Sequence, residues 1–305
     1  MMIIQNKYKK FADFCYNLFE IEEIPLYFSK YSNKLYSNYS HMFLLVYKQA
    51  RKFTYEQLME DLSDNHTLRA YLGLNALPHY STLVKFAQKL PMKVWDELLI
   101  AFKKVIEQPK KVAIDATGIT LDNASPHYCK RIGRKTKKRP FLKSSFVVDI
   151  EQGIILLCKF RKKARHDTVD AKPMVKKMAE NYLPEIFYGD RGYDDNALFT
   201  LIVEKLKAYP LILQRRLDVP KHRRKGRYRK ETIDVFDYGE YLQRNRVESW
   251  ISALKRRLGH SIKSTDDKCQ KVEAITRVIA FNIDRLIRIG ENVILVFARI
   301  TRVSY

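Results

Sequence analysis

The chain of 305 residues has few cysteines and no long apolar run. Its four cysteines form no CxxC pair, and its seven histidines show no ligand spacing with them, so neither a zinc site nor a disulfide framework is indicated. This cysteine usage favours a reduced compartment, and we expect a cytoplasmic protein. No stretch approaches the ~20 apolar residues that span a bilayer. The opening residues MMIIQNKYKKFADF also lack the basic, apolar and small-residue order of a secretion signal.

Positive charge is what the chain has in excess. Its 57 Lys and Arg residues outnumber 34 Asp and Glu residues, for a formal net charge of +23. Such an excess favours a polyanionic partner, either nucleic acid or an acidic membrane surface. At 46% hydrophobic residues the chain can bury a large core, and we expect one large domain and a smaller one.

Residues 1–105 are predicted to form short helices joined by tight turns. Thr54 and Gln57 are spaced for a capping box at the start of one helix. The last helix of the series carries Lys85 and Lys89, which is compatible with a helix-turn-helix-like module that binds DNA. A helical cap without DNA contact fits the same pattern equally well.

From residue 110 onward, short β-rich runs alternate with helical patterns. Strands are predicted at 111–120, 144–150, 154–160, 185–190 and 209–214, and helices at 170–183, 194–207, 239–263 and 269–288. The second and third strands should form a hairpin around Gly153. This order predicts an α/β fold with a mixed sheet, and the ribonuclease H-like fold has the same order. We therefore assign residues 1–105 to a helical, candidate DNA-binding domain and residues 106–305 to an α/β catalytic domain with C-terminal helices.

Two segments are dense with cations, at residues 128–143 and 221–230. Aromatic residues are interleaved with them at Tyr128, Phe141 and Tyr228. A charge run can be a solvated surface, but both runs flank candidate acids, and phosphate binding is the better interpretation. Aromatic stacking on unpaired bases is a further option.

Two aspartates lie within or at the end of predicted strands. Asp115 comes after KVAI, and Asp190 ends the run EIFYG. Side chains that leave the ends of neighbouring strands converge on one crevice, which Glu248 on the long predicted helix would close. Three carboxylates are sufficient protein ligands for Mg²⁺, or for Mn²⁺ in its place, and two such ions cleave phosphodiesters by activating a water or a 3′-hydroxyl.

Other acids have plainer interpretations. Asp194 and Asp195 are expected to be N-cap residues of the helix that follows them. Asp122, Asp149 and Asp167 are reserve candidates, and Asp167 is expected to cap the helix after the hairpin. An aspartate at a strand end also commonly caps a turn. Taken singly, Asp115 or Asp190 is therefore weak evidence for a catalytic site, and only the two residues together indicate one.

The long predicted helix carries a polar face of unusual composition. Tyr241, Arg244, Glu248 and Lys255 lie at offsets of 3, 7 and 14 from the first of them, within a wedge of roughly 60° at about 100° per residue. An apolar stripe beside this wedge should pack the helix on the sheet: Val247, Ile251, Leu254 and Leu258. The carboxylate could hold a hard cation while the neighbouring cations hold a DNA strand.

These residues resemble a known family. The spacing Tyr241-x2-Arg244-x3-Glu248-x6-Lys255 matches the Y-x2-R-x3-E-x6-K signature of insertion-sequence DDE transposases at every fixed position. IDATG around Asp115 and YGDRGYDD around Asp190 look like the segments of the family's first and second acids. The helical segment FTYEQLMEDLSDNHTLRAYLGLNALPHYSTLVKF is similar to that of the insertion-sequence-five group. The resemblance covers roughly residues 40–290.

The resemblance implies a cut-and-paste transposase with a ribonuclease H-like core. Asp115, Asp190 and Glu248 would be the catalytic acids that hold Mg²⁺, and Tyr241, Arg244 and Lys255 would bind DNA phosphates. It also implies double-stranded DNA partners, namely terminal inverted repeats and target DNA, and a homo-oligomer such as a dimer associated with the nucleoid. The 57 residues between Asp190 and Glu248 leave no room for the large insertion of some relatives. A domesticated DNA-binding protein and a stand-alone ribonuclease H-like nuclease are the alternatives.

Overall fold

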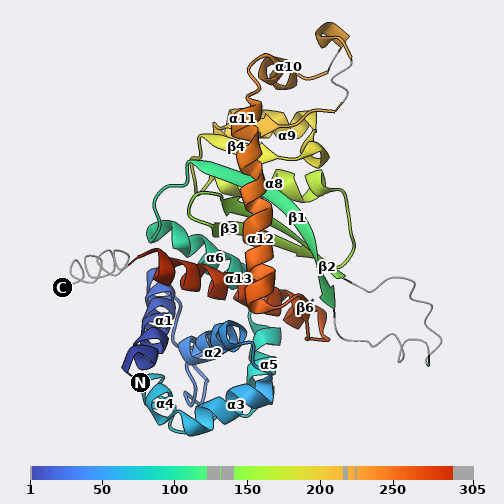
Figure 1. Cartoon of the computed structure of the whole chain (residues 1–305). Helices are drawn as coiled ribbons and strands as arrows, with labels where there is room; N and C mark the ends of the chain where they lie inside the picture. The colour runs from blue at the N-terminus through green and yellow to red at the C-terminus, as the bar shows by residue number, and fades with distance from the viewer. Residues whose placement is uncertain (1, 122–130, 132–140, 216–218, 224, 291–305) are drawn as a thin grey trace. The chain divides into compact units, whose positions relative to one another are not determined.

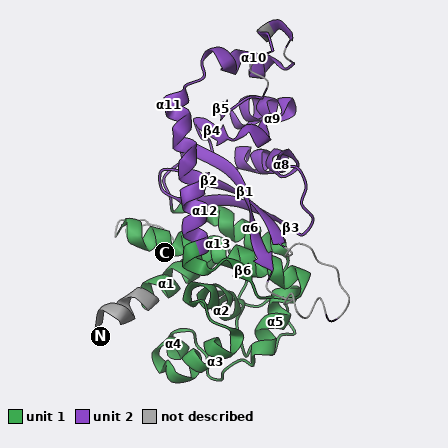
Figure 2. Cartoon of the chain, turned by 45° about the vertical axis from the view of Figure 1, so that its right-hand side comes forward, with its two compact units in different colours: residues 1–105, 256–305 green, residues 106–255 purple. Residues whose placement is uncertain are grey.

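The computed structural model describes residues 2–121, 131, 141–215, 219–223 and 225–290, with side chains from Lys9 onward except that of Lys221. It divides into two compact units, residues 106–255 and residues 1–105 with 256–305 (Figure 2). Within the described ranges no helix is both long and apolar enough to cross a membrane.

The unit of residues 106–255 is built on a mixed sheet (Figure 1). Its strands are β1 (Lys111–Leu121), β2 (Phe141–Asp149), β3 (Ile154–Arg161), β4 (Ile186–Gly189) and β5 (Tyr209–Ile212). They lie in the order β3-β2-β1-β4-β5, in which β1–β2 and β2–β3 are antiparallel and β1–β4 and β4–β5 are parallel. All five predicted strands are present, and the prediction of an α/β fold with a mixed sheet is confirmed.

The predicted hairpin forms between β2 and β3. Gly153 has φ +73°, a left-handed conformation that glycine adopts without strain. The buried Asp149 accepts hydrogen bonds from the backbone N–H groups of Glu151 and Gln152, at 2.9 and 3.2 Å, and so closes the turn. The Trp250 ring lies against Gly153, where a Cβ would come within 2.6 Å of it. Gly153 is therefore needed both for the turn and for this contact.

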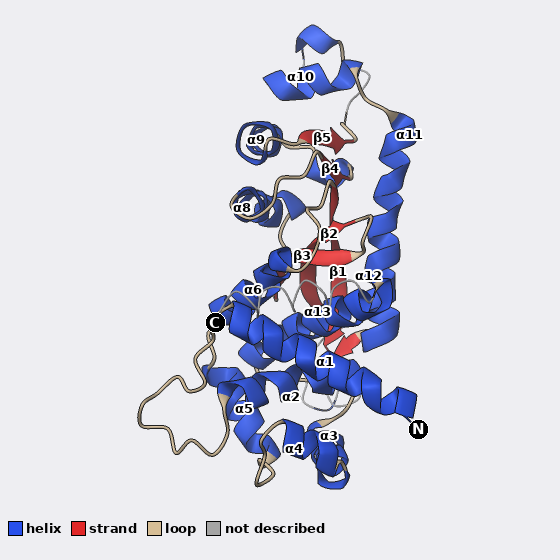
Figure 3. Ribbon diagram, turned by 90° about the vertical axis from the view of Figure 1, so that its left-hand side faces the viewer, coloured by secondary structure: helices blue, strands red, loops and turns tan. Residues whose placement is uncertain are grey.

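Helices cover both faces of the sheet in this unit (Figure 3). On one side lie α8 (Asp167–Ala179) and α9 (Asn196–Leu201), the latter continued by a π-helical turn at Ile202–Leu206. On the other side lie α11 (Tyr238–Tyr241) and the part of α12 (Asn245–Leu258) that belongs to this unit. Cationic α10 (Arg227–Asp234) precedes α11. The apolar stripe predicted for α12 is buried at Val247, Ile251, Leu254 and Leu258.

The long helix predicted at 239–263 is interrupted and shorter than expected. A 3₁₀ turn at Leu242–Arg244 separates α11 from α12. This turn advances about 20° more per residue than an α-helix, so it shifts the phase of Tyr241 relative to Glu248. Gly259 has φ +99° and ends the helix after Leu258, so Lys263 lies beyond it. The apolar stripe that predicts this helix begins at Val247, after the turn, and therefore carries no signal of the interruption.

The other unit is made almost entirely of helices. They are α1 (Met2–Ile21), α2 (Asn38–Arg51), α3 (Tyr55–Asp64), α4 (His66–Tyr71), α5 (Tyr80–Lys89), α6 (Met92–Ile100), the 3₁₀ turn Ala101–Lys104 and α13 (Asp267–Ile289), with the two-residue strand β6 (Ser261–Ile262). The capping box of Thr54 and Gln57 is present at the start of α3. The helices α1 and α6 lie in the region predicted to be helical but were not placed individually, and α10 was not predicted.

The grouping of α13 differs from the assignment of residues 106–305 to one domain. One boundary between the units falls after Val105, and residues 256–305 group with the N-terminal helices. Within this unit α13 packs against α2, and the buried Arg277 on α13 donates a hydrogen bond of 3.2 Å to Gln49 on α2. Contacts so distant in the sequence leave no local pattern, which is why the strand-and-helix order could not indicate them.

Candidate active site

Strand β1 presents alternate residues to the helical segment α11–α12. At its start, Lys111 forms an ion pair of 2.6 Å with Glu240 on α11. Six residues further, Thr117 accepts a hydrogen bond from the Lys255 ammonium on α12. Successive side chains of a strand alternate between the two faces, so Asp115 shares the face of Lys111 and Thr117 and lies between these two attachments.

Asp190 directly follows β4, the parallel neighbour of β1. The register pairs Ala113 with Tyr188, and two further steps along both strands lead to Asp115 and Asp190. Neighbouring strands are about 4.8 Å apart, so the register sets the two acids side by side. The N–H of Gly192 donates to Asp190 Oδ1 at 2.7 Å and fixes the turn in which the acid lies.

Glu248 on α12 is held by Arg244. The guanidinium donates two hydrogen bonds to Glu248 Oε1, at 2.7 and 2.8 Å. The Arg244 side chain is only 13% exposed, whereas that of Glu248 is 56% exposed. Tyr241 lies in the same electrostatic neighbourhood: burial raises the pKa of its phenol, Arg244 lowers it, and Asp190 and Glu248 raise it.

The pKa of Asp115 depends on its burial and on the charges of the two other acids. Its pKa is raised to about 6, mainly by burial and also by the charges of Asp190 and Glu248. The Ala116 N–H, which donates to Asp115 Oδ1 at 2.8 Å, and the Arg244 guanidinium act in the opposite direction. The structure thus brings Asp115, Asp190, Glu248 and Arg244 into one electrostatic site.

Lys255 reaches the same site from the C-terminal part of α12. Its ammonium donates to Thr117 Oγ1 at 2.5 Å and to the carbonyl of Gly118 at 3.0 Å. Burial lowers the pKa of Lys255, and the charge of Asp115 partly restores it. The amine is therefore half-buried against β1 rather than extended into solvent.

The oxygen atoms of the three carboxylates are suitable ligands for a hard divalent cation, but the three side chains do not converge on a single ion position in this structure. Among the described residues, no three His, Cys, Asp or Glu side chains form a group that could hold one ion. The exposed Glu248 side chain stays with Arg244 rather than with Asp115 and Asp190. The oxygen donors are those that Mg²⁺ prefers, and the raised pKa of Asp115 marks an excess of negative charge that a cation would neutralise.

Of the reserve acids, Asp149 and Asp167 have structural partners, while Asp122 lies outside the described residues. Asp149 closes the hairpin, as described above. Asp167 was expected to cap α8, but His166 is the N-cap residue, and its ring accepts from the Thr168 N–H. Asp167 lies in the first helical turn and forms an ion pair of 2.6 Å with the buried Lys143.

Only one of the two predicted caps of α9 is found. Asp195 is the N-cap residue and accepts from the Leu198 N–H at 2.9 Å. Asp194 is instead bound by Arg229 on α10, through hydrogen bonds of 2.7 and 2.8 Å. The sequence shows two adjacent aspartates before a helix, and only the fold decides which of them caps it.

Sequence reasoning missed two residues beside the acids, Lys143 and Tyr193. Lys143 on β2 is buried and contacts both Asp167 and Asp170. Tyr193 is 1% exposed, and its hydroxyl has no hydrogen-bond partner in the described part of the chain. Burial and then the charges of neighbouring acids, Asp115 and Asp190 among them, raise its pKa. The only signal in the sequence was the position of Tyr193 three residues after Asp190.

Of the two cationic runs, residues 128–143 lie mostly outside the described residues. Residues 221–230 are described except for residue 224, and the run leads into α10. In this part of the run, Arg229 forms an ion pair with Asp194, while the exposed Arg227 forms an ion pair with Glu231. Tyr228 donates a hydrogen bond of 3.1 Å to Glu204.

Comparison with known proteins identifies the family. The family model of the transposase DDE domain matches residues 107–283, more than half of the chain. No curated protein matches. Among solved structures, a piggyBac transposase synaptic complex with hairpin DNA is similar to the chain, with a TM-score of 0.49 and 10% identity over 89% of this chain and 73% of that one. The family assignment rests on residues 107–283, and the prediction of a DDE transposase is confirmed: the chain belongs to the DDE-domain transposases, enzymes of DNA transposition.

Proposed function

We propose that this DDE transposase carries out cut-and-paste transposition, in which it cleaves DNA at the transposon ends and joins the freed 3′-hydroxyl to target DNA. Asp115, Asp190 and Glu248 would be the catalytic acids and would hold Mg²⁺, or Mn²⁺ in its place. The observation that carries this proposal is the charge coupling of Asp115, which is buried and responds to both other acids. Bound divalent ions would activate the attacking oxygen and stabilise the leaving oxygen.

The residues of the chain have separate tasks in this proposal. Asp115 and Asp190 are fixed by backbone N–H donors, so their oxygens are set in place before a ligand arrives. Glu248, more exposed and on a helix, would complete the set when Arg244 turns from it to a phosphate. Tyr241 and Lys255 would contact the same DNA backbone on either side of Glu248. Each of these contacts would orient the strand for in-line attack.

The strand order supports a ribonuclease H-like interpretation of the core. Three antiparallel strands are followed by two parallel ones, with Asp115 on the central strand and Asp190 directly after its parallel neighbour. The sequence predicted a mixed sheet with this order of elements along the chain, but not the order of the strands within the sheet. We further assign the chain to the insertion-sequence-five group, because it has the tyrosine, arginine, glutamate and lysine spacing together with helices before the core.

The DNA partners in this proposal are the terminal inverted repeats and the target. Two ends must be cut and joined together, so a homo-oligomer, the simplest being a dimer on DNA, fits the reaction. The helical unit would contribute to recognition of the repeats through exposed cations such as Lys85 and Lys89 on α5.

The test uses the full chain, Mg²⁺ and DNA that carries the inverted repeats flanking its gene. Cleavage at the ends is expected, with loss of cleavage but retained DNA binding in Asp115→Asn and Asp190→Asn. Persistent cleavage in both variants would falsify the assignment of these acids. Binding without any cleavage by the unaltered chain would favour a domesticated DNA-binding protein. Cutting of branched DNA irrespective of end sequence would favour a stand-alone nuclease.

A further inference from the structure

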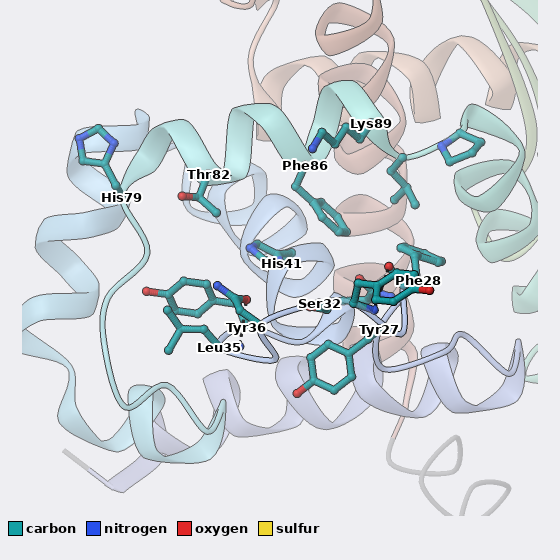
Figure 4. Close-up of a pocket in the computed structure, with 16 residues that line it drawn as sticks. Tyr27, Phe28, Ser32, Leu35, Tyr36, His41, His79, Thr82, Phe86 and Lys89 are labelled. Atoms are coloured by element: carbon teal, nitrogen blue, oxygen red, sulfur yellow. Dashed lines mark hydrogen bonds between the residues drawn. The ribbon is translucent and has the colours of Figure 1, made fainter.

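A cavity of about 820 Å³ lies within the helical unit, in a place that the proposed chemistry does not use (Figure 4). It lies between α5 and the segment that joins α1 to α2. Its walls are mainly aromatic: Tyr27, Phe28, Tyr31, Tyr36, His41 and Phe86. This volume is in the range of sites that hold small molecules, and planar walls favour a planar ligand.

The segment that forms one wall is a compact loop with its own internal bonds. Asn38 closes the base: its N–H donates to the carbonyl of Leu26 at 2.8 Å and its side-chain amide donates to that of Pro25 at 2.7 Å. The loop between them presents its aromatic rings outward, since Tyr31 is 85% and Phe28 50% exposed. Folding thus leaves open aromatic faces here, although burying them would have been favourable.

His41 supplies a polar group in the floor of the cavity. The His41 side chain extends from α2, and its ring stacks on that of Phe86, with the ring centroids 4.6 Å apart (Figure 4). The same ring lies edge-on to that of Tyr36, with the centroids 5.7 Å apart. The residue is only 8% exposed, and among the described residues nothing bonds its Nε2. A buried polar atom without a partner destabilises the fold, so a ligand that bonds to it would recover this cost.

The proton position of His41 defines what such a ligand must offer. Burial lowers the pKa of the ring, and the carbonyl of Ser37 acts in the opposite direction, so the ring is mostly neutral at pH 7. A neutral imidazole has one donor and one acceptor nitrogen. In the tautomer with its proton on Nδ1, Nε2 is an acceptor, and this tautomer would suit a ligand with an N–H or O–H group at the edge of a flat ring.

The surrounding charge is positive. Lys89 lines the cavity, Lys30 and Lys34 are exposed on the loop, and none of the lining residues is acidic. Planar walls, one buried acceptor and cations at the rim match a nucleotide within a strand. Each of the four DNA bases carries an amino or imino N–H, and the strand has a phosphate on either side of each nucleotide. A paired base has this edge occupied and its faces stacked, so only an unpaired base fits.

We propose that this cavity binds an unpaired base of a DNA strand, stacked on the aromatic walls with its N–H edge toward His41 and a neighbouring phosphate near Lys89. This inference rests on the proposed action on DNA and adds a base-binding site outside the catalytic unit.

The first experiment locates the site in the full chain. A single-stranded oligonucleotide with 5-iododeoxyuridine at successive positions is bound and irradiated, and crosslinked peptides are mapped by mass spectrometry. Crosslinks within residues 27–41 or 79–91 are expected. Efficient crosslinking confined to other segments would overturn the inference but leave the proposed transposase function intact. Failure to bind DNA at all would overturn both.

The second experiment compares a base-bearing strand with an abasic strand of equal length by fluorescence anisotropy. The full chain should prefer the base-bearing strand by about fivefold or more. Tyr31→Leu removes a stacking face and His41→Phe removes the acceptor but keeps a ring, so each should reduce this preference several-fold. Tyr238→Leu, which removes a 60% exposed ring in the other unit, is the matched control and should keep it. An unchanged preference in both cavity variants would show that the bases bind elsewhere and overturn the inference.

Discussion

Arg244 donates two hydrogen bonds to a single oxygen of Glu248, at 2.7 and 2.8 Å. The cation proposed to hold a phosphate is thus bound to the acid proposed to complete the metal site. They are four positions apart in the sequence, so they are neighbours on one helix face. An incoming phosphate and a divalent cation would separate this pair by taking one partner each. We expect the pair to be a resting state of the site rather than a fixed structural link.

Glu248→Gln tests this relationship. The amide retains an acceptor for Arg244 but loses the charge that a cation needs, so end cleavage should fall by about 10³-fold while DNA binding is retained. Cleavage and gel-shift assays on the same end DNA measure both quantities. Glu231→Gln, which neutralises a surface glutamate paired with Arg227, is the control and should cleave normally. Equal cleavage by the two variants would remove Glu248 from the catalytic set.

Asp115 should make the metal-free protein less stable as the pH rises. Its pKa is about 6 in the folded chain against an ordinary value of 3.8, so the folded state holds the proton more tightly than the unfolded state. Stability from this group is therefore lost between about pH 4 and pH 6 and stays lost above. Asp115→Asn should be more stable than the unaltered chain by about 1–2 kcal/mol at neutral pH, after allowance for partial solvation, and nearly equal to it at about pH 4. Urea unfolding in a chelator measures the difference, and a pH-independent difference would contradict this.

Mg²⁺ should stabilise the folded chain through the same acids. A ligand that binds only the folded state at 100 times its Kd adds about 2.7 kcal/mol. For a chain of this size that corresponds to a rise in Tm of roughly 4 °C. The rise should vanish in Asp190→Asn and persist in Glu231→Gln. A rise of equal size in both variants would place the cation elsewhere.

Most of the sheet could be predicted because its strands are short apolar runs bounded by turn residues. The aspartates could be paired because the order of elements sets β4 beside β1. The Arg244–Glu248 bond follows from the spacing of these residues on one helix face, whereas the 3₁₀ turn at Leu242–Arg244 that shifts the phase of Tyr241 leaves no signal in the apolar pattern. The ammonium of Lys255 lies against Thr117 and Gly118, which are remote in the sequence. The cavity around His41 depends on a loop closed by Asn38, and such closure leaves no periodic signal.

The pairing of Arg229 with Asp194 is predicted to hold α10 in place. Asp194 is 2% exposed and Arg229 18% exposed, so Arg229→Ala leaves a buried carboxylate without its cation. Loss of about 3 kcal/mol is expected, as is typical when one partner of a buried pair is removed. Arg227→Ala in the same helix breaks the exposed pair with Glu231 and should cost less than about 1 kcal/mol. Urea denaturation of the two variants measures the contrast, and losses of similar size would mean that Asp194 is solvated in solution.

Substitution of Lys255 tests whether its ammonium binds DNA or only links α12 to β1 within the fold. If the ammonium leaves Thr117 for a phosphate, Lys255→Ala should weaken end binding and reduce the slope of log affinity against log salt by about 0.9, the amount expected for one released counterion. Lys176→Ala removes an equal charge from an exposed position on α8, on the other side of the sheet (Figure 3), and should leave the slope unchanged. Salt titrations of end binding give both slopes. A lower Tm with an unchanged slope in Lys255→Ala would show that the residue only joins α12 to β1. A reduced slope would place Lys255, seven positions along the helix from Glu248, in the surface that binds the transposon end.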